Sequence, residues 1–394
     1  MKQYKFLIVA FFFTVLFASS CQAVERWRMR QDLIEVIDRD QIIFEDDGIP
    51  ETFSERLSGY SVVVLGEGSH YTYEFPQLGL DIALALHDSG YRLILIEFYH
   101  AFNAEIEDYV LNRMEQLDPF LEQAYGPFLT QVQEFNIGLP EELKVHVQAV
   151  DINHRPEQYA TSLQGLANRI PEADIVREFI SNTANGLNIE ELENFYQLLL
   201  VGEDTFKRSW GGAIYEWILE MTWVQLATLP IRENWEVDHV EAHKMREEVI
   251  KELVERRLGQ DNNRVVIYFG GNHIQREHLM GTEKEWLGGY LANRSPHAAG
   301  DTFLLYLTAA KSDYLREREI PRFDIRENHN WSELFRVLTD RAKGKPVFLP
   351  LDDEIFATET ITVNYQGSVL RHKPKEQFDG FILLPEIHSV SSTE

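Results

Sequence analysis

Four short runs of aliphatic and β-branched residues recur along the chain, and acidic or imidazole side chains follow each of them. The runs cover residues 61–65, 91–96, 145–150 and 264–269. Continuous apolar runs of this length are typical of parallel strands that are buried on both faces, whereas half-exposed strands alternate. The pattern therefore predicts an α/β fold with a mainly parallel central sheet flanked by helices.

The segments between these runs favour helices. Residues 74–87 place apolar side chains on one helical face, and Ser89-Gly90 ends the pattern. A helix between two apolar strands indicates a right-handed βαβ crossover, which implies parallel pairing of residues 61–65 with residues 91–96. Residues 156–260 are mostly helical in pattern, so we expect a helical insertion or cap over the sheet.

The domain organisation follows from length and composition. With 394 residues and 44% hydrophobic content, the chain can bury a sizeable core in one large domain. We expect a lead-in over residues 21–60 and an α/β domain over residues 61–394. Within that domain, further strands are predicted at residues 302–307, 346–349, 361–365 and 378–384.

The N-terminal residues have the pattern of an export signal. Two lysines precede an apolar run over residues 6–17, and small residues lead to Cys21, the only cysteine. The run is too short to span a membrane, so residues 1–20 are interpreted as a lipoprotein-type signal peptide with lipidation at Cys21. Cleavage after Ala23 is the alternative and would give a soluble periplasmic or secreted protein. Neither form can make an internal disulfide.

The charge of the chain limits its partners. Lys+Arg 37 against Asp+Glu 64 gives a net charge of −27, which repels phosphate backbones and excludes the basic surface that nucleic-acid binding needs. We expect a small-molecule substrate, no nucleic acid, and membrane contact only through the N-terminal lipid. The sequence leaves the oligomeric state open.

Chemically useful side chains gather where the four apolar runs end. Because ligands of open α/β sheets bind at the carboxyl edge, these side chains should converge there. In chain order they are Glu67, His70, Glu97, Asp151, His154 and His273.

These residue types permit two kinds of site. A carboxylate beside an imidazole fixes the tautomer of the ring and raises its basicity, so the ring can take a proton from water. The same groups can also hold a divalent metal. Plainer interpretations exist for three residues: Glu74 could complement a helix N-terminus, Glu97 could form a structural salt bridge, and His154 could be an ordinary loop histidine.

Several motifs resemble the erythromycin esterase family. Its Gly-Glu-x-x-His opening with a downstream Glu-Phe is similar to Gly66-Glu67-Gly68-Ser69-His70 with Glu74-Phe75, and its second glutamate to Glu97. Three further motifs of the family match this sequence only in part, because a residue of the motif is replaced in each. These motifs are its Gly-x-Asp strand end, its Arg-Asp pair and its final His-Asn-x-His. The corresponding residues here are Val150-Asp151, Arg246-Glu247 and Gly270-Gly271-Asn272-His273.

The resemblance implies a hydrolase that cleaves an ester or lactone-like bond without a metal. It implies that His70 is the general base, that Glu67 and Glu97 orient it, and that His273 polarises or protonates the leaving side, with Glu74, Asp151 and Arg246 in support. The wider superfamily of Tiki proteins and haem-uptake lipoproteins shares two of the motifs. A metal-dependent peptidase and a haem- or metal-binding lipoprotein are therefore the alternatives. Resemblance to Gram-negative lipoproteins implies a location in the bacterial envelope, at the outer membrane.

Overall fold

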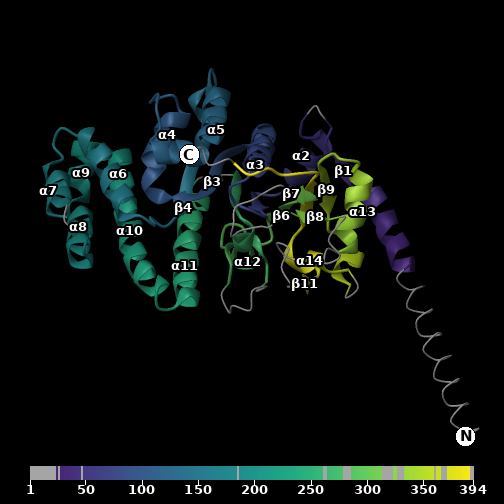
Figure 1. Cartoon of the computed structure of the whole chain (residues 1–394). Coiled ribbons are helices and arrows are strands. Elements are labelled where there is room, and N and C mark those ends of the chain that lie inside the picture. The colour runs from purple at the N-terminus through teal and green to yellow at the C-terminus, as the bar shows by residue number, and fades with distance from the viewer. Residues whose placement is uncertain are drawn as a thin grey trace, which may run out of the picture. The chain divides into compact units, whose positions relative to one another are not determined.

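The computed structural model describes residues 24, 27–45, 48–183, 186–260, 264–277, 285–312, 323–325, 332–358, 361–364 and 371–390. The chain forms two compact units (Figure 1). The larger unit is Glu51–Leu307, and the smaller unit combines Met1–Pro50 with Thr308–Glu394. The expected signal peptide, residues 1–20, and Cys21 lie outside the described residues. The expected division at residue 61 stays a prediction.

The larger unit is built on a parallel sheet. In the described part of this unit the strand order is β6-β2-β5-β3-β4, and every neighbouring pair is parallel. The strands are β2 (Val62–Glu67), β3 (Tyr91–Tyr99), β4 (His146–Asp151), β5 (Arg264–Gly270) and β6 (Thr302–Ala309). All six residues of β2 are buried, as expected for a strand covered on both faces. The predicted α/β class with a mainly parallel sheet is confirmed.

One detail of the predicted topology is wrong. The strands β2 and β3 are parallel members of one sheet, but they do not pair with each other, because β5 lies between them. The register aligns Val265 with Val62 on one side and with Leu93 on the other. The apolar run of β5 is therefore buried between two apolar neighbours, and local spacing in sequence could not reveal this insertion.

The helices of the larger unit fall into two groups. Those outside the expected insertion are α2 (Glu51–Leu57), α3 (Glu74–Ala85), α4 (Asn103–Val110), α5 (Pro119–Asn136) and α12 (Leu287–Asn293), with short 3-10 helices η1 (His87–Ser89), η2 (His100–Phe102), η3 (Glu141–Leu143) and η4 (Gly271–Ile274). The described residues between 156 and 260 are mostly helical, as predicted. They form α6 (Pro156–Asn168), α7 (Asp174–Asn182), α8 (Ile189–Val201), α9 (Glu203–Trp210), α10 (Gly212–Trp235) and α11 (His239–Leu258).

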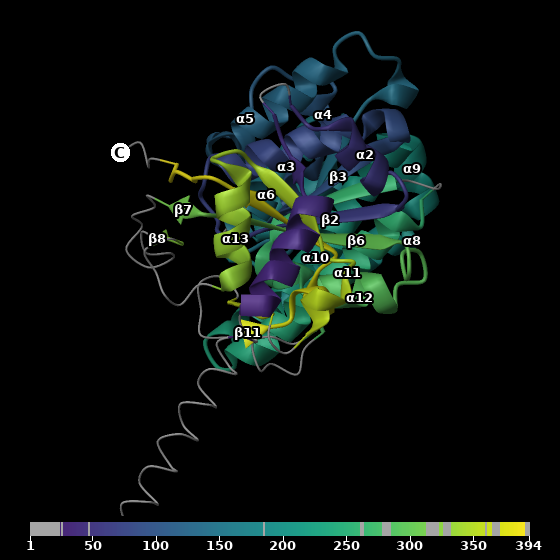
Figure 2. The ribbon, with the colours of Figure 1, turned by 90° about the vertical axis from the view of Figure 1, so that its right-hand side faces the viewer.

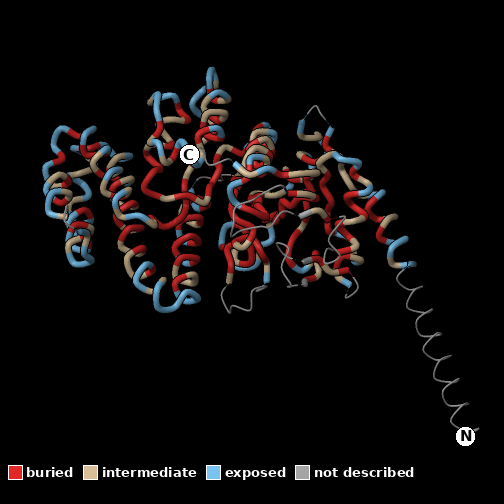
Figure 3. The backbone as a smooth tube through the Cα atoms, in the orientation of Figure 1, coloured by how far each residue is buried: buried red, intermediate tan, exposed pale blue. Residues whose placement is uncertain are grey.

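Helices α6 to α10 share an apolar cluster that includes Tyr159, Phe195 and Tyr215. Helices α10 and α11 lie side by side, and α11 packs against β4 (Figures 1 and 2). The strands and the inner faces of these helices are the buried parts of the unit (Figure 3). None of the helices within the described residues has the length and apolar character needed to cross a membrane.

The smaller unit contains antiparallel strands. Strands β1 (Ile42–Ile43), β9 (Val347–Pro350) and β12 (Gly380–Leu384) pair in the order β1-β9-β12. Two short pairs join β7 (Lys311–Ser312) to β8 (Phe323–Asp324) and β10 (Val363–Asn364) to β11 (Arg371–His372). The described helices are residues 27–40, α13 (Glu333–Ala342), η5 (Glu354–Ala357) and α14 (Pro374–Gln377). The strand predicted at residues 361–365 is β10, and residue 365 lies outside the described residues.

Candidate active site

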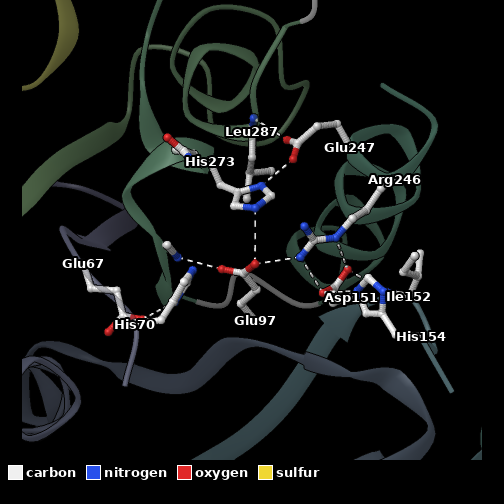
Figure 4. A network of polar contacts seen from close by, with 12 residues as sticks. Glu67, His70, Glu97, Asp151, Ile152, His154, Arg246, Glu247, His273 and Leu287 are labelled. Carbon is white, nitrogen blue, oxygen red and sulfur yellow. Dashed lines mark hydrogen bonds and ion pairs between the residues drawn. The ribbon is translucent and has the colours of Figure 1, made fainter. Parts of the chain in front are cut away.

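The carboxyl ends of four parallel strands bring a polar network together in the larger unit (Figure 4). Strands β2, β3 and β4 contribute Glu67, Glu97 and Asp151, and η4, directly after β5, contributes His273. Helix α11 adds Arg246 from outside the sheet. Contacts join Glu97, Arg246, Asp151, His154 and His273 into one set, whereas Glu67 and His70 form a separate pair next to Gly270.

Glu67 and His70 form a carboxylate–imidazole pair. The Nδ1 atom of His70 lies 2.6 Å from Oε1 of Glu67, and the hydroxyl of Tyr268 donates to the other carboxylate oxygen. The His70 side chain is 52% exposed, and no described residue hydrogen-bonds to its Nε2 atom. Because Nδ1 is engaged, Nε2 is the atom through which His70 can exchange a proton with a ligand.

The turn between β2 and α3 holds His70 in this position. Tyr71, the next residue, has a φ of 60°, a left-handed conformation that is unfavourable for a tyrosine. Non-glycine residues in this region persist where the surrounding structure requires them, and they cluster at functional sites.

The electrostatics of the pair favour a protonated ring. Desolvation opposes the charged form of His70, but the hydrogen bond to Glu67 and the charges of Glu67 and Glu97 outweigh it and raise the pKa of His70 to about 9. For Tyr268, burial and the neighbouring Glu67 charge raise the pKa well above its usual range. Tyr268 therefore remains a hydrogen-bond donor to the carboxylate.

Glu97 is the centre of the network (Figure 4). Its oxygens contact Nη2 of Arg246 at 2.6 Å, the backbone N–H of Gly270 at 2.7 Å and Nε2 of His273 at 3.2 Å. Burial would raise the pKa of Glu97, but the charges of His273, Arg246 and His70 together with the hydrogen bond from His273 hold it well below the usual value. Glu97 is therefore a mostly buried, ionised carboxylate whose charge is stabilised by protein donors in place of water.

Arg246 links Glu97 to Asp151. Its Nε and Nη2 atoms donate to the two oxygens of Asp151 at 2.8 and 2.6 Å, and Asp151 also accepts from the Ile152 N–H at 2.7 Å. Burial opposes ionisation of Asp151, but the Arg246 charge lowers the pKa of the carboxyl. His154 lies at the rim of this pair, with Nε2 3.5 Å from Asp151 and its ring next to Tyr99.

His273 is held on both sides. Its Nδ1 atom pairs with Glu247, and its Nε2 atom faces Glu97. Desolvation lowers its basicity, but the charges of Glu247 and Glu97 prevail and raise the pKa of His273 to about 9. The side chain is only 6% exposed, so His273 forms a buried cation behind Glu97. Its expected role at the leaving group would require one of these carboxylate contacts to open.

With His70 and Glu97 in their present positions, residue 270 has room only for a glycine. A Cβ atom there would lie 2.7 Å from Cε1 of His70 and 3.1 Å from Oε2 of Glu97. The backbone of Gly270 thus fits against both side chains while its N–H donates to Glu97. This packing accounts physically for a glycine where the family motif has a histidine.

The remaining residues sit around the network. Glu74 is the first residue of α3 and is partly buried, a position that complements the positive end of the helix.

Three residues of the network, Tyr268, Glu247 and Tyr125, were not predicted as site residues from the sequence. The period-2 pattern of β5 could have indicated Tyr268, because Tyr268 shares a strand face with Gly270. Tyr125, whose hydroxyl donates to the Glu97 carbonyl at 3.3 Å, comes from α5 and leaves no local signal.

The pairing of the carboxylates in the network decides which chemistry it suits. Its carboxylates are already engaged by Arg246, the imidazoles and backbone N–H groups. Among the described residues, no group of three or more His, Cys, Asp or Glu side chains has the arrangement of a metal site. The donor set, as arranged, fits proton transfer at His70 better than it fits metal coordination.

Comparisons with known proteins support the fold. Neither protein-family models nor curated proteins gave a match to the chain. A solved Bacillus cereus protein is similar, with a TM-score of 0.67, 13% identity and coverage of 93% of this chain and 99% of that one. A structure described as a succinoglycan biosynthesis protein has a TM-score of 0.68 at 13% identity, covering 91% of this chain and 98% of that one.

A third similar structure is a mutant of erythromycin esterase EreC in its open conformation. The TM-score is 0.62 at 15% identity, and the match covers 87% of this chain and 95% of that one. Identities this low establish a shared fold and nothing finer. The chain therefore has the fold of erythromycin esterase EreC, which is the fold that its motifs indicated.

Proposed function

We propose that this protein is a hydrolase that cleaves an ester or lactone bond of a small molecule with water activated by His70. The observation that carries the proposal is the Glu67–His70 pair. One ring nitrogen is held 2.6 Å from a buried carboxylate, and the other belongs to a ring that solvent reaches. The fold shared with erythromycin esterase EreC supports the reaction class.

The reaction needs His70 in its neutral form. Nε2 of His70 takes a proton from water as the water oxygen bonds to the carbonyl carbon, giving a tetrahedral intermediate. The carbon–oxygen bond to the leaving group then breaks, and Nε2 returns the proton to the departing oxygen. Glu67 holds the tautomer throughout, and the nearby charge of Glu97 stabilises the transient imidazolium.

The buried groups position the reacting pair. Arg246 joins Glu97 on β3 to Asp151 on β4, and His273 with Glu247 joins Glu97 to α11. We assign these residues a positioning role, because their polar atoms are engaged with one another. Glu74 is assigned to the support of the turn that precedes α3.

The proposed activity uses no metal and no haem. The alternatives are a Tiki-like metal-dependent peptidase and a haem- or metal-binding lipoprotein that uses the same histidines. We propose further that the protein is anchored in the bacterial envelope by a lipid on Cys21, at the outer membrane, with the soluble form cleaved after Ala23 as the alternative.

A substrate screen tests the function. Purified mature protein is offered panels of esters, lactones and peptides, with and without a strong chelator, and its absorption is recorded after addition of haem. We expect turnover of an ester or lactone that the chelator leaves unchanged. If the chelator abolishes turnover and an added transition metal restores it, the result would favour the metal-dependent peptidase. A Soret band with no hydrolysis would favour the haem-binding alternative.

A further inference from the structure

A cavity lies in the larger unit, away from the polar network. Its volume is about 480 Å³, within the usual range of about 300 to 1,000 Å³ for small-ligand sites. It is lined by Gln148 on β4, Tyr196 on α8, residues of α10 and α11, and Gln260. On α11, Arg257 follows Arg246 by eleven residues, or roughly 16 Å along the helix, so the cavity is separate from the candidate active site.

Aromatic rings form part of the cavity wall. Tyr196, Trp217 and Trp223 line it, and all three are partly exposed. The guanidinium of Arg256 lies 4.0 Å from the centre of the Trp223 ring and braces its position. Aromatic rings with one accessible face suit ligands that offer a flat array of C–H groups.

Unsatisfied polar atoms lie in the same wall. Among the described residues, neither Oε1 of Gln148 nor Nε of Arg257 has a hydrogen-bond partner, although both atoms are buried. Arg257 is itself 5% exposed. Because both atoms lie below the surface of the wall, a ligand in the cavity does not contact them. Gln148 as a whole is partly exposed and lines the cavity, and its amide can both donate and accept, so it suits a ligand with hydroxyl groups.

The charges of the cavity are balanced internally. Glu220 pairs with Arg257 and lies 3.6 Å from Arg256, and behind the wall it also contacts His100 at 2.9 Å. Glu216 pairs with Lys207 at 2.6 Å. The charged residues that line the cavity are Glu216, Glu220, Arg256 and Arg257, two of each sign, so the cavity suits an uncharged ligand.

We propose that this cavity binds an uncharged oligosaccharide. Tyr196, Trp217 and Trp223 pack against the C–H faces of the sugar rings, and the amide of Gln148 bonds to their hydroxyls. The site would hold the protein on a glycan independently of any hydrolysis at His70.

Tryptophan fluorescence of the full mature protein tests the site directly. The probes are the neutral hexasaccharides cellohexaose, maltohexaose, mannohexaose and chitohexaose, with hexagalacturonate as the anionic comparison. At least one neutral probe should shift the emission in a saturable way, because the ligand contacts Trp217 and Trp223, while hexagalacturonate should not. No saturable shift with any neutral probe, or a saturable shift of similar size with hexagalacturonate, would overturn the proposal.

Variants locate the binding. Trp223→Ala should weaken binding of the neutral probe by about tenfold or more, since a stacked ring is lost. Trp27→Ala is the matched control, because Trp27 is 62% exposed and does not line the cavity. If Trp223→Ala lowers the melting temperature, Gln148→Leu, which keeps the side-chain size, takes its place and should also weaken binding. Unchanged affinity in the folded variants would place the sugar elsewhere and refute the site.

Discussion

His70 and His273 have similar raised pKa values but opposite surroundings. Both pKa values are about 9, because each ring faces two carboxylates. Solvent reaches the His70 ring, whereas carboxylates contact both nitrogens of the buried His273 ring. Of these two histidines, only His70 is therefore placed to exchange protons with a substrate, and His273 acts as a fixed positive charge.

The first prediction concerns the carboxylate that sets the pKa of His70. Glu67→Gln removes the charge that raises this pKa, so the value should fall from about 9 toward the ordinary histidine value of about 6.5. The measurement is an NMR titration of the His70 ring, which needs no substrate. Tyr268→Phe is the control, because it removes only a neutral donor to Glu67 and leaves the charge in place. A pKa of His70 that stays near 9 in Glu67→Gln would contradict the pairing.

The sequence predicted part of this arrangement. A glutamate three residues before a histidine, directly after a buried strand, indicated a pair at the sheet edge, and Glu67 and His70 form it. The engagement of both nitrogens of His273 was not predictable. It depends on Glu247, which a helix far away in sequence brings to the ring.

At the scale of elements, the end of β5 is fitted to the turn after β2. Glu67 and Gly270 are register partners, so the backbone of β5 passes directly beside His70. The sequence showed a glycine at this point, but only the strand order explains why. The insertion of β5 between β2 and β3 is a tertiary pairing that local periodicity does not encode.

The second prediction tests this fit. Gly270→Ala adds a Cβ atom 2.7 Å from the His70 ring, so the ring should be displaced. Activity should fall by about tenfold or more, since small misplacements of a catalytic group are costly. The His70 NMR signals should shift in the same variant. Unchanged His70 signals would show that the ring does not occupy this space.

The third prediction concerns the tie between α11 and the sheet. Arg246→Ala leaves the buried carboxylates of Glu97 and Asp151 without their partner, which should cost about 3 to 5 kcal/mol in the free energy of unfolding. Arg113→Ala removes the exposed pair with Glu141 and should leave the free energy of unfolding nearly unchanged, because solvent screens exposed ion pairs. Urea denaturation measures both. Equal small losses would mean that α11 is not held by this network.

At the scale of the whole molecule, the sequence predicted the class of fold well. Five of the predicted strands are the parallel strands of the larger unit, because strands buried on both faces show as continuous apolar runs. The antiparallel order β1-β9-β12 was not predicted, since short apolar segments carry no sign of their pairing direction. The cavity beside α10 and α11 was also missed, because its lining comes from three helices, a strand and one residue beyond α11.

The fourth prediction concerns the N-terminus, outside the described residues. Cys21 should carry lipid, and Cys21→Ser should release the protein from the membrane fraction. Cell fractionation and mass spectrometry of the mature N-terminus measure this. If wild type and variant are both soluble and both begin at residue 24, the result would support cleavage after Ala23.

The most direct test of the central claim is the comparison of kcat/KM for wild type and His70→Ala on the best ester or lactone from the screen. His297→Ala is the matched control, because His297 is 46% exposed and also lies near a carboxylate, that of Glu255. Loss of a general base should lower kcat/KM by about a hundredfold to ten-thousandfold, while the melting temperature stays close to wild type. The wild-type rate should also rise from pH 7 toward pH 9, because only about one His70 ring in a hundred is neutral at pH 7 when the pKa is about 9. Full activity in a folded His70→Ala protein would contradict the proposed mechanism.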